Sequence, residues 1–358
     1  MANGPTGVAV GAASTTPSTG TPRGHQATQG QKAAPAHETT VAARFAEIAA
    51  QAATGHLDCP PPGTGDTARR FDVLRRIAAE DLSLGRLAEG HFDAVAILRE
   101  LGDRPPAPGE RWGVWAAEPP GTGVTARREG NAWSLTGLKR YCSGARACTH
   151  ALVTARSGEN ELLLAVELDP ATCVPAPGTW PAVGMAASDS LDVRFRGAAA
   201  RVVGAPGAYL RRPGFHHGGV GVAACWLGGA DAVARVLYAA AARSASPLRD
   251  SHLGAVEIDL RAAWAVLAEA AAEIDDDPLD HHGGAAARAL RARGCAAAAC
   301  ARVLDGTGEA TGAGPLCHDA RHARAVADLT VYVRQHHGRR DLAALGAHVS
   351  GRSGDDGP

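Results

Sequence analysis

A block of strand-like sequence between two stretches of helical periodicity is the feature that most limits how this chain can fold. From Trp112 to about Arg212, short apolar runs are bounded by Gly, Pro, Asn and Asp. Several of them alternate between apolar and polar residues, as half-buried strands do. On either side, large apolar residues recur at the spacing of amphipathic helices. The pattern predicts a mainly helical α+β fold with an antiparallel β-barrel or β-sandwich in the middle.

The changes of pattern also predict domain boundaries. The first residues have almost no large apolar side chain, so burial cannot offset their ordering entropy and we expect them to be disordered. The expected regions are a disordered tail (1–40), a short N-terminal helical domain (41–110), a β-domain (111–213), a C-terminal four-helix bundle (214–348) and a tail (349–358). The four helices are expected over 219–242, 252–275, 284–304 and 319–337.

Charge and composition narrow the classes of partner. Lys plus Arg number 36 and Asp plus Glu 37, so we expect no general attraction to nucleic acid or to an anionic membrane. No apolar run approaches the length of a membrane span and no secretory signal is present, which predicts a cytoplasmic protein without a membrane partner. The eight cysteines form no CxxC pair. His318 and His322 lie four residues apart without the glutamate of a metalloprotease motif, so we expect surface histidines and no metal site.

The segment from Trp112 to Ala155 carries the most chemical information. It contains the Gly/Pro loop EPPGTG, whose backbone can approach a ligand closely. A strand of the form W-x-L-x-G-x-K follows, and then an aromatic–x–Ser turn at Tyr141–Ser143. A flavin needs a flat aromatic neighbour, a hydroxyl and backbone N–H groups. Any one feature alone favours an ordinary hairpin, whereas their ordered combination favours flavin binding.

This combination resembles the middle β-domain of acyl-CoA dehydrogenases, and the flanking helical segments resemble the other regions of that family, over roughly residues 70–348. The resemblance implies that FAD lies between the β-domain and the helices and that the chain forms a homodimer or homotetramer. The flavin contacts carried over by the resemblance are Trp115, Ala117, Thr122, Gly123, Tyr141 and Ser143.

The chain also departs from the family pattern where the chemistry occurs. An acyl-CoA dehydrogenase removes a substrate α-proton with a glutamate, and the two segments expected to hold it, FHHGGVGVAACW and VRQHHGRRDLA, contain none. In the FAD loop, Ala117 replaces a threonine, and Gly-Ser-Asp becomes Gly-Thr-Gly. The candidates to replace the glutamate are His216, His217, His336, His337 and Asp341.

Three functions agree with these observations. The first is α,β-dehydrogenation of an acyl-CoA or other acyl thioester, with hydride transfer to flavin N5 and an external electron acceptor. The second is a flavin-dependent monooxygenase supplied by a flavin reductase, because reduced flavin reacts with oxygen without an α-proton base. Arg334 and His336 resemble a pair in that branch of the superfamily. The third is a non-catalytic relative that keeps the scaffold for assembly or for holding a ligand.

Overall fold

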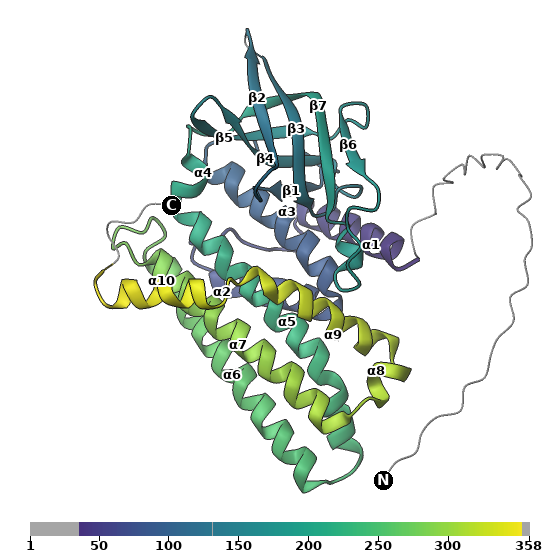
Figure 1. The fold of residues 1–358 in the computed structure, drawn as a ribbon. Coiled ribbons are helices and arrows are strands. Elements are labelled where there is room, and N and C mark those ends of the chain that lie inside the picture. Colours follow the sequence, from purple (N-terminus) through teal and green to yellow (C-terminus); the bar gives the residue numbers. More distant parts are fainter. Residues whose placement is uncertain (1–35, 131, 353–358) are drawn as a thin grey trace, which may run out of the picture. The chain divides into compact units, whose positions relative to one another are not determined.

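The computed structural model describes residues 36–130 and 132–352. The helices of the N-terminal region are α1 (Ala36–Ala53), α2 (Thr67–Glu80) and α3 (Leu82–Glu100) (Figure 1). Asp81 separates α2 from α3, and its carboxylate accepts the backbone N–H of Leu84 at 3.0 Å, which caps α3. Helix α1 begins five residues inside the expected disordered tail, so that boundary was wrong over 36–40, and the rest of the expected tail lies outside the described residues.

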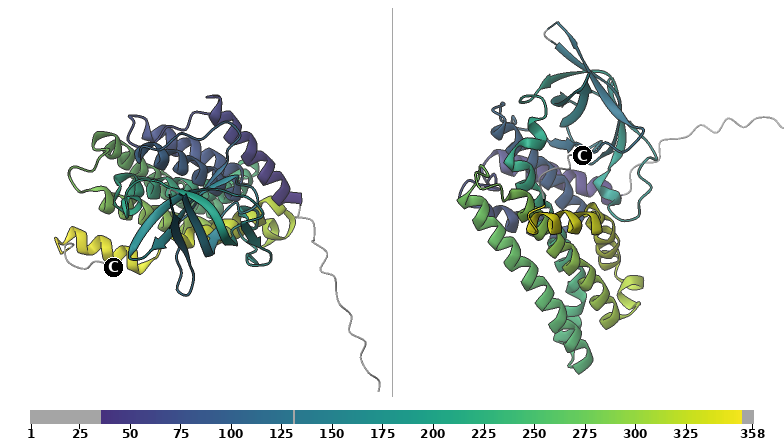
Figure 2. Two further views of the ribbon diagram at one scale, coloured as in Figure 1. Left: turned by 90° about the horizontal axis from the view of Figure 1, so that it is seen from above. Right: turned by 60° about the vertical axis from the view of Figure 1, so that its left-hand side comes forward.

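The middle region is a β-barrel. Its strands are β1 (Trp112–Trp115), β2 (Gly123–Glu129), β3 (Ala132–Cys142), β4 (His150–Ser157), β5 (Asn160–Glu167), β6 (Cys173–Ala176) and β7 (Leu191–Val202). The order β4-β2-β3-β7-β5 closes on itself because β5 pairs with β4 (Figure 2). The barrel alternative is therefore confirmed. The expectation of a wholly antiparallel sheet was wrong, because β1 and β2 each pair with β4 in parallel.

Alternating side chains fill this barrel. Along β2, Val124 and Ala126 are buried while Thr125 and Arg127 are exposed. Leu135, Val153, Leu164, Val193 and Phe195 are among the buried residues of the same cluster. The period of two along each strand thus places one set of side chains in the interior, as the sequence pattern indicates.

The C-terminal region is helical, but its helices differ from those expected. They are α4 (Ala208–Arg211), α5 (Pro213–Arg243), α6 (Pro247–Asp276), α7 (Ala285–Thr311), α8 (Gly314–His318), α9 (Ala320–Tyr332) and α10 (Arg339–Val349). Helices α5, α6 and α7 run side by side (Figure 1), and α2 packs on α5 and α6. The helix expected over 319–337 ends at Tyr332, where a 3-10 turn and Gly338 with φ 58° lead into α10. The four-helix bundle is therefore not confirmed.

The N-terminal and C-terminal helices share one hydrophobic core. Phe45 of α1, Leu74 of α2 and Leu84 of α3 are buried in the same cluster as Trp226 and Leu237 of α5. Full burial of a large apolar side chain contributes roughly 1.5–3 kcal/mol. The two helical regions are therefore stabilised largely by contact with each other.

Helix α5 is long and apolar enough, by length and composition alone, to cross a membrane. The expectation that no segment approaches such a span was wrong in this respect. However, 72% of its apolar window is buried inside the protein. Burial on most sides is what a core helix of a globular protein shows.

Helix α3 packs against the barrel. Ile97 and Leu98 of α3 form a buried cluster with Trp112 of β1 and Leu163 of β5. The Nδ1 atom of His91, also on α3, accepts the backbone N–H of Trp112 at 3.2 Å. These contacts fix the start of the barrel on the helices.

Candidate functional site

The turn that follows β3 presents an aromatic ring and a hydroxyl. Tyr141 has φ 59°, a conformation that is costly for a residue with a side chain, and its ring is 46% exposed. The buried hydroxyl of Ser143 shares a hydrogen bond of 2.9 Å with the hydroxyl of Ser190. Trp115 is buried, and its Nε1 donates to the Ser143 carbonyl at 3.0 Å. Trp115 therefore supports the turn from beneath, and Tyr141 is the exposed ring.

The Gly/Pro loop lies beside the same strand. Gly123 pairs with Leu138 of β3, close to Tyr141. The Thr122 hydroxyl donates to the Pro119 carbonyl at 2.8 Å and closes the turn, while Ala117 is exposed. A Cβ added at Gly123 would meet no atom within 4 Å. The backbone is consequently open to a ligand along this loop.

Buried Lys139 holds the loop to the barrel. Its Nζ donates to Glu118 at 3.1 Å and to the Thr154 carbonyl at 2.9 Å. Burial lowers the pKa of Lys139, and the ion pair with Glu118 opposes that shift. Because the ammonium is fully paired within the loop and barrel, Lys139 positions the loop and is not available to a ligand.

His336, His337 and Asp341 come together where α9 gives way to α10. Asp341 accepts a hydrogen bond from the backbone N–H of His337 at 3.0 Å and another from His337 Nδ1 at 3.3 Å. His336 Nδ1 accepts the N–H of Gly338 at 3.2 Å, so the neutral ring carries its proton on Nε2, which lies 3.7 Å from Asp341. Burial lowers the pKa of His336. Burial alone would raise the pKa of Asp341, but the hydrogen bonds and charge of the histidines lower it.

The other candidate bases lie elsewhere. His217 is buried in the first turns of α5, and its Nε2 makes a 3.1 Å hydrogen bond with the Pro278 carbonyl. Burial lowers the pKa of both His217 and His216. The side chain of Arg334 is exposed. No hydrogen bond or ion pair within the described part of the chain joins these residues to His336.

Arg293 of α7 was not predicted, and it ties these segments together. Its guanidinium donates to the carbonyls of Gly219 and Gln335, each at 3.1 Å. It also lies over the ring of Trp226, 4.7 Å from the centroid. Arg293 thereby fixes the backbone next to His336 against α5 and α7.

His336 belongs to a group of buried donors without partners. Among the described residues, no group accepts from Trp226 Nε1, the Tyr332 hydroxyl, Arg86 Nε or His336 Nε2. The Trp226 ring lies 6.3 Å from that of Tyr332 and 6.5 Å from that of His336. Buried polar groups without partners are rare, and each indicates a place for a ligand or a water molecule. His336 was predicted for this site, whereas Arg86, which forms an ion pair with Glu89, was not.

The turn that follows Tyr141 lies against helix α3 near Arg86. A Cβ at Gly144 would touch Leu87, the neighbour of Arg86. The thiol of Cys148, whose pKa burial raises to about 12, lies near the charge of Arg86 and approaches the carbonyl of Ser143. An exposed ring, an open loop and a group of unpaired donors fit the needs of a flavin, which requires a flat neighbour and hydrogen-bond partners at its polar edge.

Comparisons with known proteins identify the fold. No family model matches the sequence, and no curated protein matches it. Among solved structures, XiaF from a Streptomyces species, in complex with FADH2 and glycerol, is 20% identical with a TM-score of 0.68 over 88% of each chain. Dibenzothiophene monooxygenase (TdsC) from Paenibacillus sp. A11-2 is 18% identical with a TM-score of 0.66, over 87% of this chain and 96% of that one. A nitrososynthase from Micromonospora carbonacea var. africana is 17% identical with a TM-score of 0.67, over 87% of this chain and 94% of that one.

These structures have the acyl-CoA dehydrogenase fold. The protein has that fold, and the resemblance seen in its sequence is confirmed at the level of the fold. At this level of identity the comparison establishes the fold and leaves the reaction to be argued from the site.

Proposed function

We propose that this protein is a flavin-dependent monooxygenase that receives reduced FAD from a separate flavin reductase. The observation that carries the proposal is the hydrogen bonding of the His336 ring. Its Nδ1 lone pair is occupied by the N–H of Gly338, so Nε2 presents a proton and not a base. When bound, reduced flavin supplies the electrons that activate oxygen, a reaction that needs no α-proton base.

The other groups near His336 also suit donation. The Tyr332 hydroxyl and Trp226 Nε1 are donors without partners in the described chain. Together with His336 Nε2 they would orient acceptor atoms of the substrate or of the flavin edge. Asp341 is a poor general base, because its lowered pKa makes the carboxylate a weaker proton acceptor.

The names of two structural neighbours support this proposal, since one is a monooxygenase and another a nitrososynthase. FAD as the particular flavin and the homodimer or homotetramer are part of the proposal by resemblance alone, and a cytoplasmic location is part of it on the sequence pattern alone.

A dehydrogenase is the second candidate, and one observation favours it. The hydrogen bond from His337 Nδ1 to Asp341 leaves the other nitrogen of His337 able to accept a proton. An imidazole oriented by a carboxylate is a recurrent general base. The His337 side chain is 65% exposed, however, whereas a base acting on a weakly acidic thioester α-proton gains from a site that excludes water.

The test begins with the purified full chain and FAD. Oxygen uptake with substrate hydroxylation by the reduced, flavin-loaded protein is expected, and acyl-CoA thioesters should not bleach oxidised FAD. His336→Gln should lower turnover about 10-fold or more, and His281→Gln, at an exposed histidine, serves as the control. Bleaching by an acyl-CoA without reductant, abolished by His337→Gln, would establish the dehydrogenase instead. Failure to bind either form of FAD would leave the non-catalytic scaffold.

A further inference from the structure

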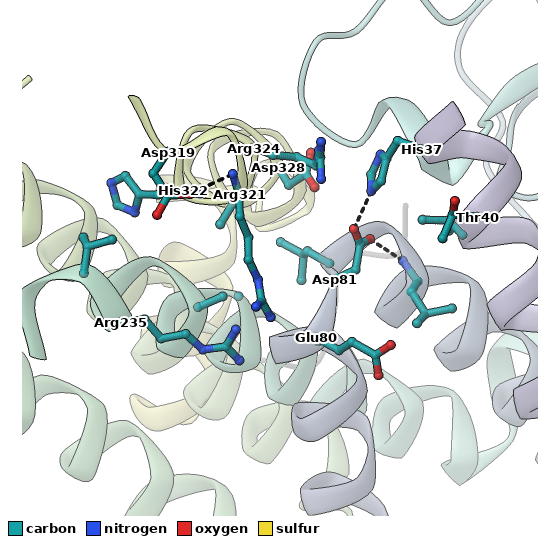
Figure 3. Close-up of a pocket in the computed structure, with 18 of the residues that line it drawn as sticks. His37, Thr40, Glu80, Asp81, Arg235, Asp319, Arg321, His322, Arg324 and Asp328 are labelled. Carbon is teal, nitrogen blue, oxygen red and sulfur yellow. Dashed lines mark hydrogen bonds and ion pairs between the residues drawn. The ribbon is translucent and has the colours of Figure 1, made fainter. Parts of the chain in front are cut away.

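A second site lies among α1, the α2–α3 junction, the second half of α5 and the first half of α9 (Figure 3). The cavity there has a volume of about 560 Å³, within the range of small-molecule sites. Its wall includes apolar side chains, among them Val41, Leu82, Leu84, Ala232 and Val236. None of the residues expected to hold flavin or to act in catalysis lines it.

Two carboxylates on the α1 and α3 side of the cavity are already engaged. Glu80 accepts from Arg44 at 3.2 Å. Asp81 pairs with His37 at 2.7 Å and caps α3 through the backbone N–H of Leu84. These acids therefore serve the structure and do not neutralise a cation elsewhere in the cavity.

The two carboxylates on the α9 side are engaged as well. Asp319 accepts the backbone N–H groups of Arg321 and His322 at 3.0 and 3.1 Å, so the N-terminus of α9 is capped. Asp328 accepts the N–H of Met185 at 2.5 Å. An anion attracted to this cavity would thus meet side-chain cations and not the helix terminus.

Two arginine side chains that line the cavity face each other. Arg235 of α5 and Arg321 of α9 extend their guanidinium groups toward one another (Figure 3). The Arg321 side chain makes no hydrogen bond or ion pair within the described chain, and Arg235 donates to the Ala79 carbonyl. Burial, and next the charge of Arg321, lower the pKa of Arg235, while the nearby Asp231 is already bonded to Arg75 at 2.6 Å. An anion between the two guanidiniums would relieve their repulsion.

His322 gives an independent sign of a ligand. It is only 5% exposed, so the expectation of a surface histidine was wrong for this residue. The residue is part of the cavity wall, and its buried Nδ1 has no hydrogen-bond partner among the described residues. A buried polar atom in a cavity wall is normally satisfied by a ligand or by water.

We propose that this cavity binds a small organic anion with an apolar body. A carboxylate would pair with Arg235 and Arg321, since guanidinium groups bind carboxylates through charge-assisted hydrogen bonds. The hydrocarbon part would cover the apolar wall, and His322 would supply a further polar contact. The proposal does not depend on the monooxygenase reaction.

Calorimetric titration of the full chain with octanoate tests this inference. The wild-type protein is expected to bind octanoate, and acetate and octanol, which each lack one half of the chemistry, should bind far more weakly. Arg235→Met and Arg321→Met should each weaken octanoate binding about 10-fold or more. Arg127→Met, at an exposed arginine of β2, should bind like the wild type.

Several results would overturn the proposal. One is absence of octanoate binding at millimolar concentration, and another is unchanged affinity in both arginine variants whose circular dichroism shows a normal fold. Sedimentation provides the third. If the wild type is an oligomer that Arg321→Met dissociates, and octanoate does not bind, this surface is a contact between copies of the chain.

Discussion

Acidification should lower the free energy of unfolding through His91, a residue of α3 that is hydrogen-bonded to the first residue of β1. His91 is 4% exposed, and its Nδ1 accepts the backbone N–H of Trp112. Burial, and next the charge of Arg111, lower the pKa of His91 from 6.5 to about 4. The folded state therefore holds a neutral imidazole over a pH range in which the unfolded chain is already protonated.

The size and sign of the effect follow from the two pKa values. A separation of about 2.5 pKa units corresponds to about 3 kcal/mol in the free energy of unfolding. Because the unfolded state binds the proton more readily, this stability is fully present above pH 6.5. It is lost progressively as the pH falls toward 4, below which the loss levels off.

Urea unfolding from neutral to acidic pH measures this loss. His91→Asn keeps an acceptor for the Trp112 N–H but cannot ionise, so its stability should fall less steeply between pH 6.5 and 4. His281→Asn, at an exposed position, should follow the wild type. An identical slope in the wild type and in His91→Asn would refute the reasoning.

Three further substitutions probe the contacts around α9. A Cβ at Gly184 would overlap the Ala327 carbonyl, so Gly184→Ala should lower the unfolding free energy by about 1–3 kcal/mol, whereas Gly254→Ala, with open space, should not. Burial raises the pKa of Asp328 to about 6, so its ionisation lowers the free energy of unfolding as the pH rises from 4 to 6. Asp328→Asn should therefore raise the free energy of unfolding by up to about 3 kcal/mol at pH 7 and leave it unchanged at pH 3. Tyr332→Phe removes a hydroxyl without a partner, so it should not lower the melting temperature although it reduces turnover.

The sequence predicted the parts of this fold whose pattern is local. The spacing of Phe45, Ile48 and Ala52 predicts a helix; in α1 the first two are buried and Ala52 is partly buried, and Gly102, predicted to end the next helical region, follows α3. The segment 128–139 also predicts two strands joined by a turn at 129–131; β2 and β3 pair there, and residue 131 of that turn lies outside the described residues. Strand β6 was missed because Pro175 argues against a strand, and β6 is indeed an edge strand paired with β7.

The remaining features depend on contacts between distant segments. Helix α9 ends at Tyr332, although the helical pattern continues toward His337, and the signal that was overlooked is Gly338. Trp226 lies in the apolar helix α5 and Tyr332 on the apolar face of α9, where sequence periodicity gives both of them core positions. Their unpaired donors become visible only when α5 and α9 are packed together.

Anaerobic titration of the full chain with reduced FAD, followed by oxidised FAD, tests the central claim most directly. The account predicts saturable binding of reduced FAD that Tyr141→Ala weakens about 10-fold or more and that Tyr238→Ala, at an exposed tyrosine of α5, leaves unchanged. A protein that is folded but takes up neither form of the flavin, or whose uptake does not depend on Tyr141, would contradict it.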